Sequence, residues 1–174
     1  MSSFNPNDGP RPPAHGLTPR AVHESQSQMA EVVLPNDANP LGSLLGGRLM
    51  HLIDIAGAIA AGRHCRRQVV TASVDHLDFH NPIRLGELIV LEAQVNRAFH
   101  TSVEVGVEVF SENFSKGERK HTTTAFLTFV ALDENKRPTP VTPVIPETDE
   151  EKRRYDEAGQ RRENRLALRE RMKK

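Results

Sequence analysis

The segment that most constrains this chain's fold is LLGGRLMHLIDIAGAIAAG, residues 44–62. Its spacing predicts a helix that is apolar on almost every side from Leu52 to Ala61, and such a helix must be surrounded by protein. Gly46 and Gly47 stand at the start of this helix and allow another group to approach its backbone closely, and Gly62 suits the C-terminal end of the helix. The core therefore has to form around one long helix.

Strand-like segments lie on both sides of the predicted helix. Residues 31–34 are a candidate strand before it, and four runs with strand patterns follow it. Consecutive strands with short links predict an antiparallel meander that wraps the helix, so the fold class is α+β. One sheet leaves the far side of the helix bare, which predicts a dimer. The four later runs are residues 69–79, 87–98, 101–110 and 121–132.

The two ends of the chain differ from its middle. Residues 1–20 are rich in proline and poor in large apolar side chains, which predicts a disordered tail. Residues 147–174 carry 10 basic and 8 acidic residues, which is typical of a solvated helix with i,i+4 pairs or of a frayed tail. A thin apolar stripe leaves docking on a partner subunit as the alternative; its members are Tyr155, Ala158, Leu166 and Met172. Residues 21–146 then form the one domain.

Charge and cysteine content exclude several classes of protein. The chain has 23 basic and 23 acidic residues, so we expect no nucleic-acid partner. A single cysteine, Cys65, excludes an intrachain disulfide framework and fits a reducing, cytoplasmic compartment. No apolar run of about 18 residues and no apolar leader are present, so we expect neither a membrane span nor a secretory signal.

Asp54 is the one carboxylate within the apolar helix. It could reach solvent or pair with His51 one turn earlier, or it could serve as a general base, since an unpaired charge in apolar surroundings costs several kcal/mol. Asn39 lies in the preceding loop, in LPNDANPLG, where Asn and Asp also serve in ordinary turns. Gly46 and Gly47 could offer backbone N–H groups to an oxyanion at the helix N-terminus, or could be simple entry glycines.

Other motifs of catalysis are incomplete. The spacing of Gly42 and Gly47 imitates a phosphate-binding loop, but Arg48 and Leu49 follow where Lys and Ser or Thr are required. No G-x-S-x-G nucleophile elbow is present. The eight histidines show no metal-ligand spacing, so we expect no metal site.

Several segments together resemble one family. The stretch LPNDANPLGSLLGGRLMHLIDIAGAIAAGRHC, followed by VVTASVDHLDFHNPIRLGELIVLEAQV, TSVEVGVEV and TAFLTFVALDENKRP, is similar to the acyl-CoA thioesterases of the hotdog fold, in their cytosolic acyl-CoA hydrolase branch. The resemblance covers about residues 28–140. It implies a sheet wrapped around the helix, dimers in which two sheets join into one, and further assembly into trimers of dimers, a homohexamer.

The resemblance also implies an activity and a catalytic pair. The activity is hydrolysis of a fatty acyl-CoA thioester to a free fatty acid and coenzyme A, without a metal or covalent cofactor. Asn39 matches the family's catalytic asparagine and Asp54 its helix carboxylate, and the two come from different subunits. Asp54 would act as general base or as nucleophile, Asn39 would position water and substrate, and Gly46 and Gly47 would stabilise the oxyanion.

Further contacts are carried over from the same resemblance. The acyl-CoA contact regions correspond to His80, Asn81, Pro82, Thr101 and Ser102. Cations near strand ends could meet the phosphates of coenzyme A, namely Arg97, Lys116, Arg119 and Lys120. Leu45 departs from the aromatic residue or histidine that many relatives have before the glycine pair, which affects the expected acyl-chain preference.

Two other functions stay open from the residues. A hotdog domain that senses acyl-CoA without turning it over would fit the same fold, although such regulators need an attached DNA-binding helix-turn-helix. A hotdog enoyl-CoA hydratase or dehydratase uses a histidine with a helix carboxylate, and His51 with Asp54 could form that pair.

Overall fold

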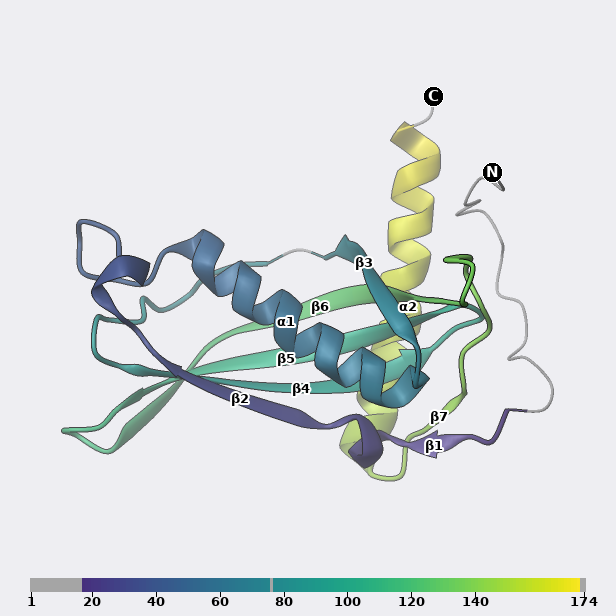
Figure 1. Ribbon diagram of the computed structural model, residues 1–174, viewed down its shortest axis with the longest axis horizontal. Coiled ribbons are helices and arrows are strands. Elements are labelled where there is room, and N and C mark those ends of the chain that lie inside the picture. Colours follow the sequence, from purple (N-terminus) through teal and green to yellow (C-terminus); the bar gives the residue numbers. More distant parts are fainter. Residues whose placement is uncertain (1–16, 76, 173–174) are drawn as a thin grey trace.

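The computed structural model describes residues 17–75 and 77–172, which form one sheet wrapped around a long helix (Figure 1). Two short strands form a separate parallel pair, and 3₁₀ turns occupy Val22–Ser25 and Pro35–Asp37. The helices are α1 (Gly46–Cys65) and α2 (Asp149–Met172). The strands are β1 (Arg20–Ala21), β2 (Ser27–Val32), β3 (Gln68–Val74), β4 (Leu88–Ala98), β5 (Ser102–Asn113), β6 (Glu118–Leu132) and β7 (Val144–Ile145).

The main sheet has the strand order β2-β4-β5-β6-β3, and all its pairs are antiparallel. Only β4, β5 and β6 form the meander that the sequence predicts. The prediction of four consecutive neighbours is wrong for β3, because β3 pairs with β6 at one edge of the sheet, whereas β4, the next strand in the chain, lies beside β2 at the other edge. This strand order places β2 and β3 along opposite flanks of α1, so that the curled sheet encloses the helix from both sides (Figure 1).

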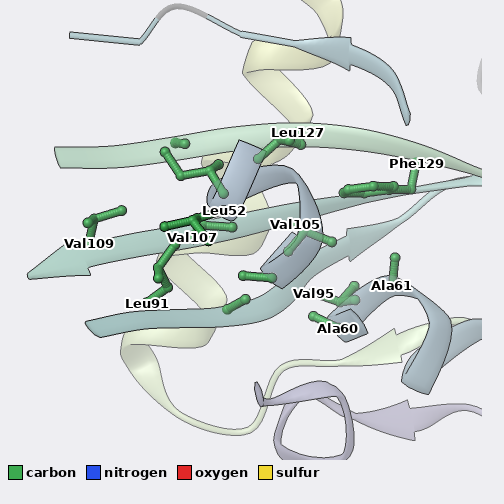
Figure 2. Packing of buried hydrophobic residues seen from close by; sticks show 14 of the residues in the cluster. Leu52, Ala60, Ala61, Leu91, Val95, Val105, Val107, Val109, Leu127 and Phe129 are labelled. Carbon is green, nitrogen blue, oxygen red and sulfur yellow. The ribbon is translucent and has the colours of Figure 1, made fainter. Parts of the chain in front are cut away.

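The core lies between α1 and the concave face of the sheet (Figure 2). Alternate residues of β5, Val103, Val105, Val107 and Val109, are fully buried there. Gly57 is required at the closest approach, since a Cβ on it would lie 2.9 Å from the Phe129 ring. The helix contributes Leu49, Leu52, Ile53, Ala56, Ala60 and Ala61.

Apolar side chains stay partly exposed on α1 and on the outer strand β3. Met50 and Ile59 of α1 are 48% and 38% exposed, and Val70 and Val74 of β3 are 47% and 44% exposed. The exposed side of α1 is where the sequence predicts that the apolar helix needs a second copy. One chain therefore covers most, but not all, of the helix.

Helix α2 lies across the opposite face of the sheet, behind the strands in Figure 1. The sequence predicts a solvated helix here with i,i+4 ion pairs. Such pairs do line its outer side, as between Arg153 and Glu157. The side that faces the sheet, however, is not solvated. There Ala158 is fully buried and Arg161 donates to Glu104, a carboxylate of β5 that is itself fully buried. Ion pairs to the sheet take the place of an apolar helix face.

The described chain begins before the predicted domain boundary. Arg20, assigned to the tail, belongs to β1 and pairs with Val144 of β7. Residues 17–19 of the predicted disordered tail have no helix or strand, and residues 1–16 lie outside the described residues. Within the described part of the chain, no helix has the length and apolar character needed to cross a membrane.

The C-terminal end of α1 holds a buried histidine beside the buried cysteine. His64 Nε2 donates to the carbonyl of Thr142 at 2.8 Å, while its Nδ1 is buried without a hydrogen-bond partner in the described structure. Burial lowers the pKa of His64, and the nearby charge of Arg20 lowers it further. Burial also raises the pKa of the Cys65 thiol to about 12, as expected for a structural cysteine.

The buried histidine predicts a loss of stability in mild acid. Below pH 6.5 the unfolded chain binds a proton that folded His64 resists, so the free energy of unfolding should fall by up to about 1.4 kcal/mol per pH unit until the folded pKa is reached. Urea unfolding of wild type and His64→Gln at about pH 7.5 and about pH 5.5 measures this. The loss should be smaller in the variant, and equal losses in both proteins would contradict the assignment.

Candidate active site

Asp54 lies in the third turn of α1, on the side that faces β3. It is half-buried, and its Oδ1 accepts a hydrogen bond from Thr71 Oγ1 at 2.6 Å. Among the described residues it has no ion pair, and His51, one turn earlier, is exposed and forms no recorded bond to it. The carboxylate is thus held by a neutral hydroxyl and keeps lone pairs available for a water or a substrate.

Thr71 is a site residue that sequence reasoning missed. It belongs to β3, 17 positions after Asp54, and a bulge follows it in the pairing of β3 with β6. Its strand pattern gives no sign of a catalytic neighbour. Only the way β3 lies along α1 brings its hydroxyl to the carboxylate.

Asn39 is fixed within the loop that precedes α1. Its side-chain Oδ1 accepts from the backbone N–H groups of Leu41 at 3.0 Å and Ser43 at 3.2 Å, and its own N–H donates to the Ser43 carbonyl at 2.7 Å. These bonds use the amide oxygen and orient the side chain. Its Nδ2 makes no recorded hydrogen bond in the described structure and can donate to a ligand.

Arg48 ties this loop to the rest of the site. Its Nη2 donates to both carboxylate oxygens of Glu31 on β2, at 3.0 and 2.9 Å, and its Nε lies 3.1 Å from Asp37 Oδ1. The Asp37 carbonyl accepts from the N–H of Leu45 at 2.8 Å. The loop that carries Asn39 is therefore clamped between β2 and the start of α1.

The N-terminus of α1 presents free backbone donors. The first helical bond runs from the N–H of Leu49 to the carbonyl of Leu45, and no side chain caps the helix. The N–H groups of Gly46 and Gly47 therefore have no partner within the helix. A Cβ on Gly47 would meet nothing within 4 Å, whereas a Cβ on Gly46 would lie 3.4 Å from the Phe79 ring.

A single chain does not bring Asn39 and Asp54 together. Asp54 lies about 12 Å along α1 from Gly46, at a rise of about 1.5 Å per residue. The loop with Asn39 lies beyond that N-terminal end, and no recorded hydrogen bond joins the two residues within the part of the chain that the structure describes. One end of the helix thus carries the amide and the backbone donors, and its middle carries the carboxylate.

The remaining contact candidates separate into two groups. Asn81 Nδ2 donates to the His121 carbonyl at 3.2 Å, and His80 and Pro82 are exposed beside it. This segment lies near the N-terminal end of α1, since Phe79 lies against Gly46. Thr101 instead lies in the β4–β5 turn and Ser102 is the first residue of β5, at the other end of the sheet, where the carbonyl of neighbouring His100 accepts from the N–H of Val141.

The four candidate cations do not form one basic patch in the described structure. Arg97 donates to the Tyr155 carbonyl at 3.2 Å, and its guanidinium lies 4.3 Å from the centre of the Tyr155 ring. Arg119 pairs with Glu92 at 2.7 Å. Lys116 lies in the exposed β5–β6 turn, and Lys120 pairs with Glu118 at 3.1 Å. No group of three or more potential metal ligands is found among the described residues.

Comparison with known proteins identifies related sequences. The model of the thioesterase superfamily matches residues 41–117. The uncharacterized acyl-CoA thioester hydrolase YkhA of Bacillus subtilis is 45% identical over 142 residues, 82% of this chain and 83% of that protein. The cytosolic acyl coenzyme A thioester hydrolase of Rattus norvegicus is 36% identical over 141 residues, 80% of this chain but only 37% of that longer protein.

Solved structures show the same fold. An acyl-CoA hydrolase from Staphylococcus aureus, in complex with butyryl coenzyme A, coenzyme A and coenzyme A disulfide, matches with a TM-score of 0.83 and 39% identity over 88% of this chain and 94% of that one. An apo hexameric acyl-CoA thioesterase matches with a TM-score of 0.85 and 42% identity over 87% of this chain and 97% of that one.

Variants of the Staphylococcus aureus hydrolase have also been solved, in which an Asn, an Asp or a Thr is replaced by Ala. Those three residues are separated by 15 and 17 positions along that chain. Asn39, Asp54 and Thr71 have the same two spacings here.

The Arg48 clamp predicts a local effect. Arg48→Ala should increase hydrogen exchange across residues 37–45, because the loop loses both ion pairs, while the free energy of unfolding falls by only about 1 kcal/mol, as for part-exposed pairs. Arg48→Lys, which can keep one ion pair, is the matched control, and its hydrogen exchange in this loop should lie between that of wild type and that of Arg48→Ala. Unchanged exchange in this loop in Arg48→Ala would show that the clamp does not hold it.

Proposed function

Because this chain belongs to the thioesterase superfamily, we propose that it hydrolyses fatty acyl-CoA to a free fatty acid and coenzyme A at a site shared between two subunits. The proposal of a shared site rests on one observation: within one chain, the two groups of candidate residues lie far apart. Asp54 and Thr71 form one part, halfway along α1. Asn39, Gly46 and Gly47 form the other, at the N-terminal end of the helix.

The edge at β3 is the surface that we propose for the two-fold dimer. Asp54 lies beside this strand, and two apolar side chains there stay exposed: Met50, one turn before Asp54 on α1, at 48%, and Val74 of β3 at 44%. The strand pairs only with β6 in the described chain, so its other side can extend the sheet into a second copy. A two-fold axis here covers the bare side of α1 and brings a partner's loop toward the carboxylate.

The chemistry follows from the groups that this arrangement would bring together. Asp54 accepts a proton from a water whose oxygen attacks the thioester carbon, while the amide of Asn39 from the other subunit orients the water or the carbonyl. The N–H groups at the start of α1 stabilise the negative charge that develops on the carbonyl oxygen. The carbon–sulfur bond then breaks, and the departing thiolate takes up a proton to give coenzyme A.

A nucleophilic role for Asp54 gives the same products. The carboxylate would attack the thioester carbon and expel the thiolate, and water would then hydrolyse the resulting mixed anhydride. In both cases Thr71 positions the carboxylate by its hydrogen bond to one oxygen and leaves the other oxygen free. Thr71 is thus a positioning residue. The matching spacings of Asn, Asp and Thr in the Staphylococcus aureus variants support the assignment of all three.

The wider expectations follow from the family. The hexameric relative supports a homo-oligomer, which we propose to be a trimer of dimers. The cytosolic rat relative supports a cytoplasmic location. Hydrolysis without a resident metal or cofactor, and the absence of a nucleic-acid partner, stay predictions.

The other functions considered for this fold gain no support from a particular contact. A hydratase would need His51 to work with Asp54, but His51 is exposed and makes no recorded bond to the carboxylate in the described structure. Nothing in the geometry favours a sensor that binds acyl-CoA without turnover.

Removal of either catalytic group should abolish turnover. Asp54→Asn should lower kcat for an acyl-CoA by about 10²–10⁴-fold and Asn39→Ala by about 10²–10³-fold, as for a lost base and a lost orienting amide. Release of free thiol measures both, with sedimentation to check that the oligomer is intact. Full activity in both variants would refute the site.

The Thr71 hydroxyl should affect kcat more than KM. Thr71→Val removes a hydrogen bond to a charged group and should lower kcat by about 10–100-fold. Thr71→Ser keeps the hydroxyl and should restore most of the rate. If Thr71→Ser were as slow as Thr71→Val, packing rather than the hydrogen bond would explain the loss.

A further inference from the structure

Helix α2 crosses the strands of the sheet one after another. Tyr155 packs against Arg97 of β4, and Arg154 and Arg161 pair with Glu108 and Glu104 of β5. Arg161 also lies 3.7 Å from the centre of the Phe126 ring on β6. These contacts show that α2 runs across the sheet from β4 toward β3.

The last anchor of α2 lies at the edge of the sheet. Arg165 Nη1 donates to Asp75 at 2.8 Å, and Asp75 directly follows the last residue of β3, Val74. Both side chains are mostly buried, at 14% and 18% exposure. Beyond this pair, residues 166–172 continue as helix, and Figure 1 shows α2 projecting past β3.

The projecting part of α2 is long enough to reach another sheet. Seven residues of helix span about 10 Å, which is about two strand spacings of 4.7–4.9 Å. We call residues 166–172 the overhang. It cannot contact its own main sheet, because β3 is the last strand on that side.

The helix is held rigidly where it crosses the sheet. Ala158 is fully buried, and a Cβ on Gly159 would overlap the guanidinium of Arg97. Small residues at these two positions let the helix lie close to the strands. The overhang is thus presented in one direction and loses little freedom when it docks.

The overhang makes no recorded ion pair or side-chain hydrogen bond with the rest of the described chain, while Arg162, in the turn before it, lies 4.4 Å from the centre of the Phe99 ring. Leu168 and Met172 are 58% and 79% exposed. Arg162 and Arg169 have no recorded carboxylate partner among the described residues. Burial lowers the pKa of Arg162, and the nearby charges of Arg165, Arg169 and Arg97 lower it further.

We propose that the overhang docks on the outer face of a second copy's sheet, across the edge formed by β3. The inference rests on the dimer described under the proposed function, since two chains joined at β3 place a partner's sheet under the overhang. The partner would cover the exposed apolar side chains of the overhang, Leu168 and Met172. Each α2 would then hold both sheets from the outside, opposite the catalytic face.

Hydrogen exchange of the intact full-length protein tests the contact. Docked amides of residues 166–172 should exchange at least about tenfold more slowly than expected for two exposed terminal turns, and the protection should fall when the protein is diluted to monomer. Fast exchange of these amides in the intact dimer would overturn the proposal.

A truncation after Arg165 supplies the second measurement. It keeps every anchor of α2 on its own sheet, and it should raise the dimer dissociation constant by at least about tenfold in a sedimentation dilution series. Phe114→Ser, which changes an exposed apolar side chain in the β5–β6 turn, is the control and should leave the constant unchanged.

The remaining outcomes separate this proposal from the proposed function. An unchanged dissociation constant in the truncated chain, with acyl-CoA hydrolysis retained, overturns the overhang contact and leaves the enzyme site intact. Loss of a higher assembly without weakening of the dimer also overturns it, because the overhang would then contact another dimer. A full-length chain that is monomeric and inactive overturns both.

Discussion

The burial of α1 is the constraint on which this structure depends. A helix that is apolar nearly all round cannot lie on a sheet as an ordinary amphipathic helix does, because one flat face would cover only one side. The sheet therefore curls, with β2 and β3 along the flanks of the helix. Even so, Met50 and Ile59 of α1 stay partly exposed. The incompleteness of one chain is a direct consequence of how apolar the helix is.

The same incompleteness explains how a carboxylate is tolerated on this helix. Asp54 is not in the packed interface between α1 and the sheet but on the half-buried side toward β3, where Thr71 satisfies one of its oxygens. Its charge is hydrated in one chain and would be enclosed only when a second copy covers that side. Enclosure at an interface strengthens the electrostatic effect of such a group on a bound thioester. The side of α1 that one chain leaves uncovered thus carries both exposed apolar side chains and the carboxylate of Asp54.

Local patterns predicted the elements but not their long-range pairing. The helix expected at residues 44–62 is found at Gly46–Cys65, and the strands lie close to their expected ranges. The position of β3 was wrong, because alternation along a strand carries no information about which strand lies beside it. Thr71 escaped notice for the same reason.

The errors in charged segments have a different origin. In the sequence, Arg154 and Arg161 look like members of solvated i,i+4 pairs, and their partners on β5 look like outward-facing strand residues. The structure joins them across about fifty positions of sequence, so that charge rather than apolar area holds α2 to the sheet. Arg97 was likewise expected near a phosphate, but it lies under α2 against Tyr155. Spacing along the chain could not distinguish these outcomes.

Mixing two inactive variants tests the shared site most directly. If Asn39 and Asp54 act from different subunits, reassociation of equal amounts of Asn39→Ala and Asp54→Asn chains makes half of the dimers mixed, each with one intact site. About a quarter of wild-type thiol release from an acyl-CoA should then return. If both residues acted within one chain, every site would lack one group and no activity would return, which would contradict the account.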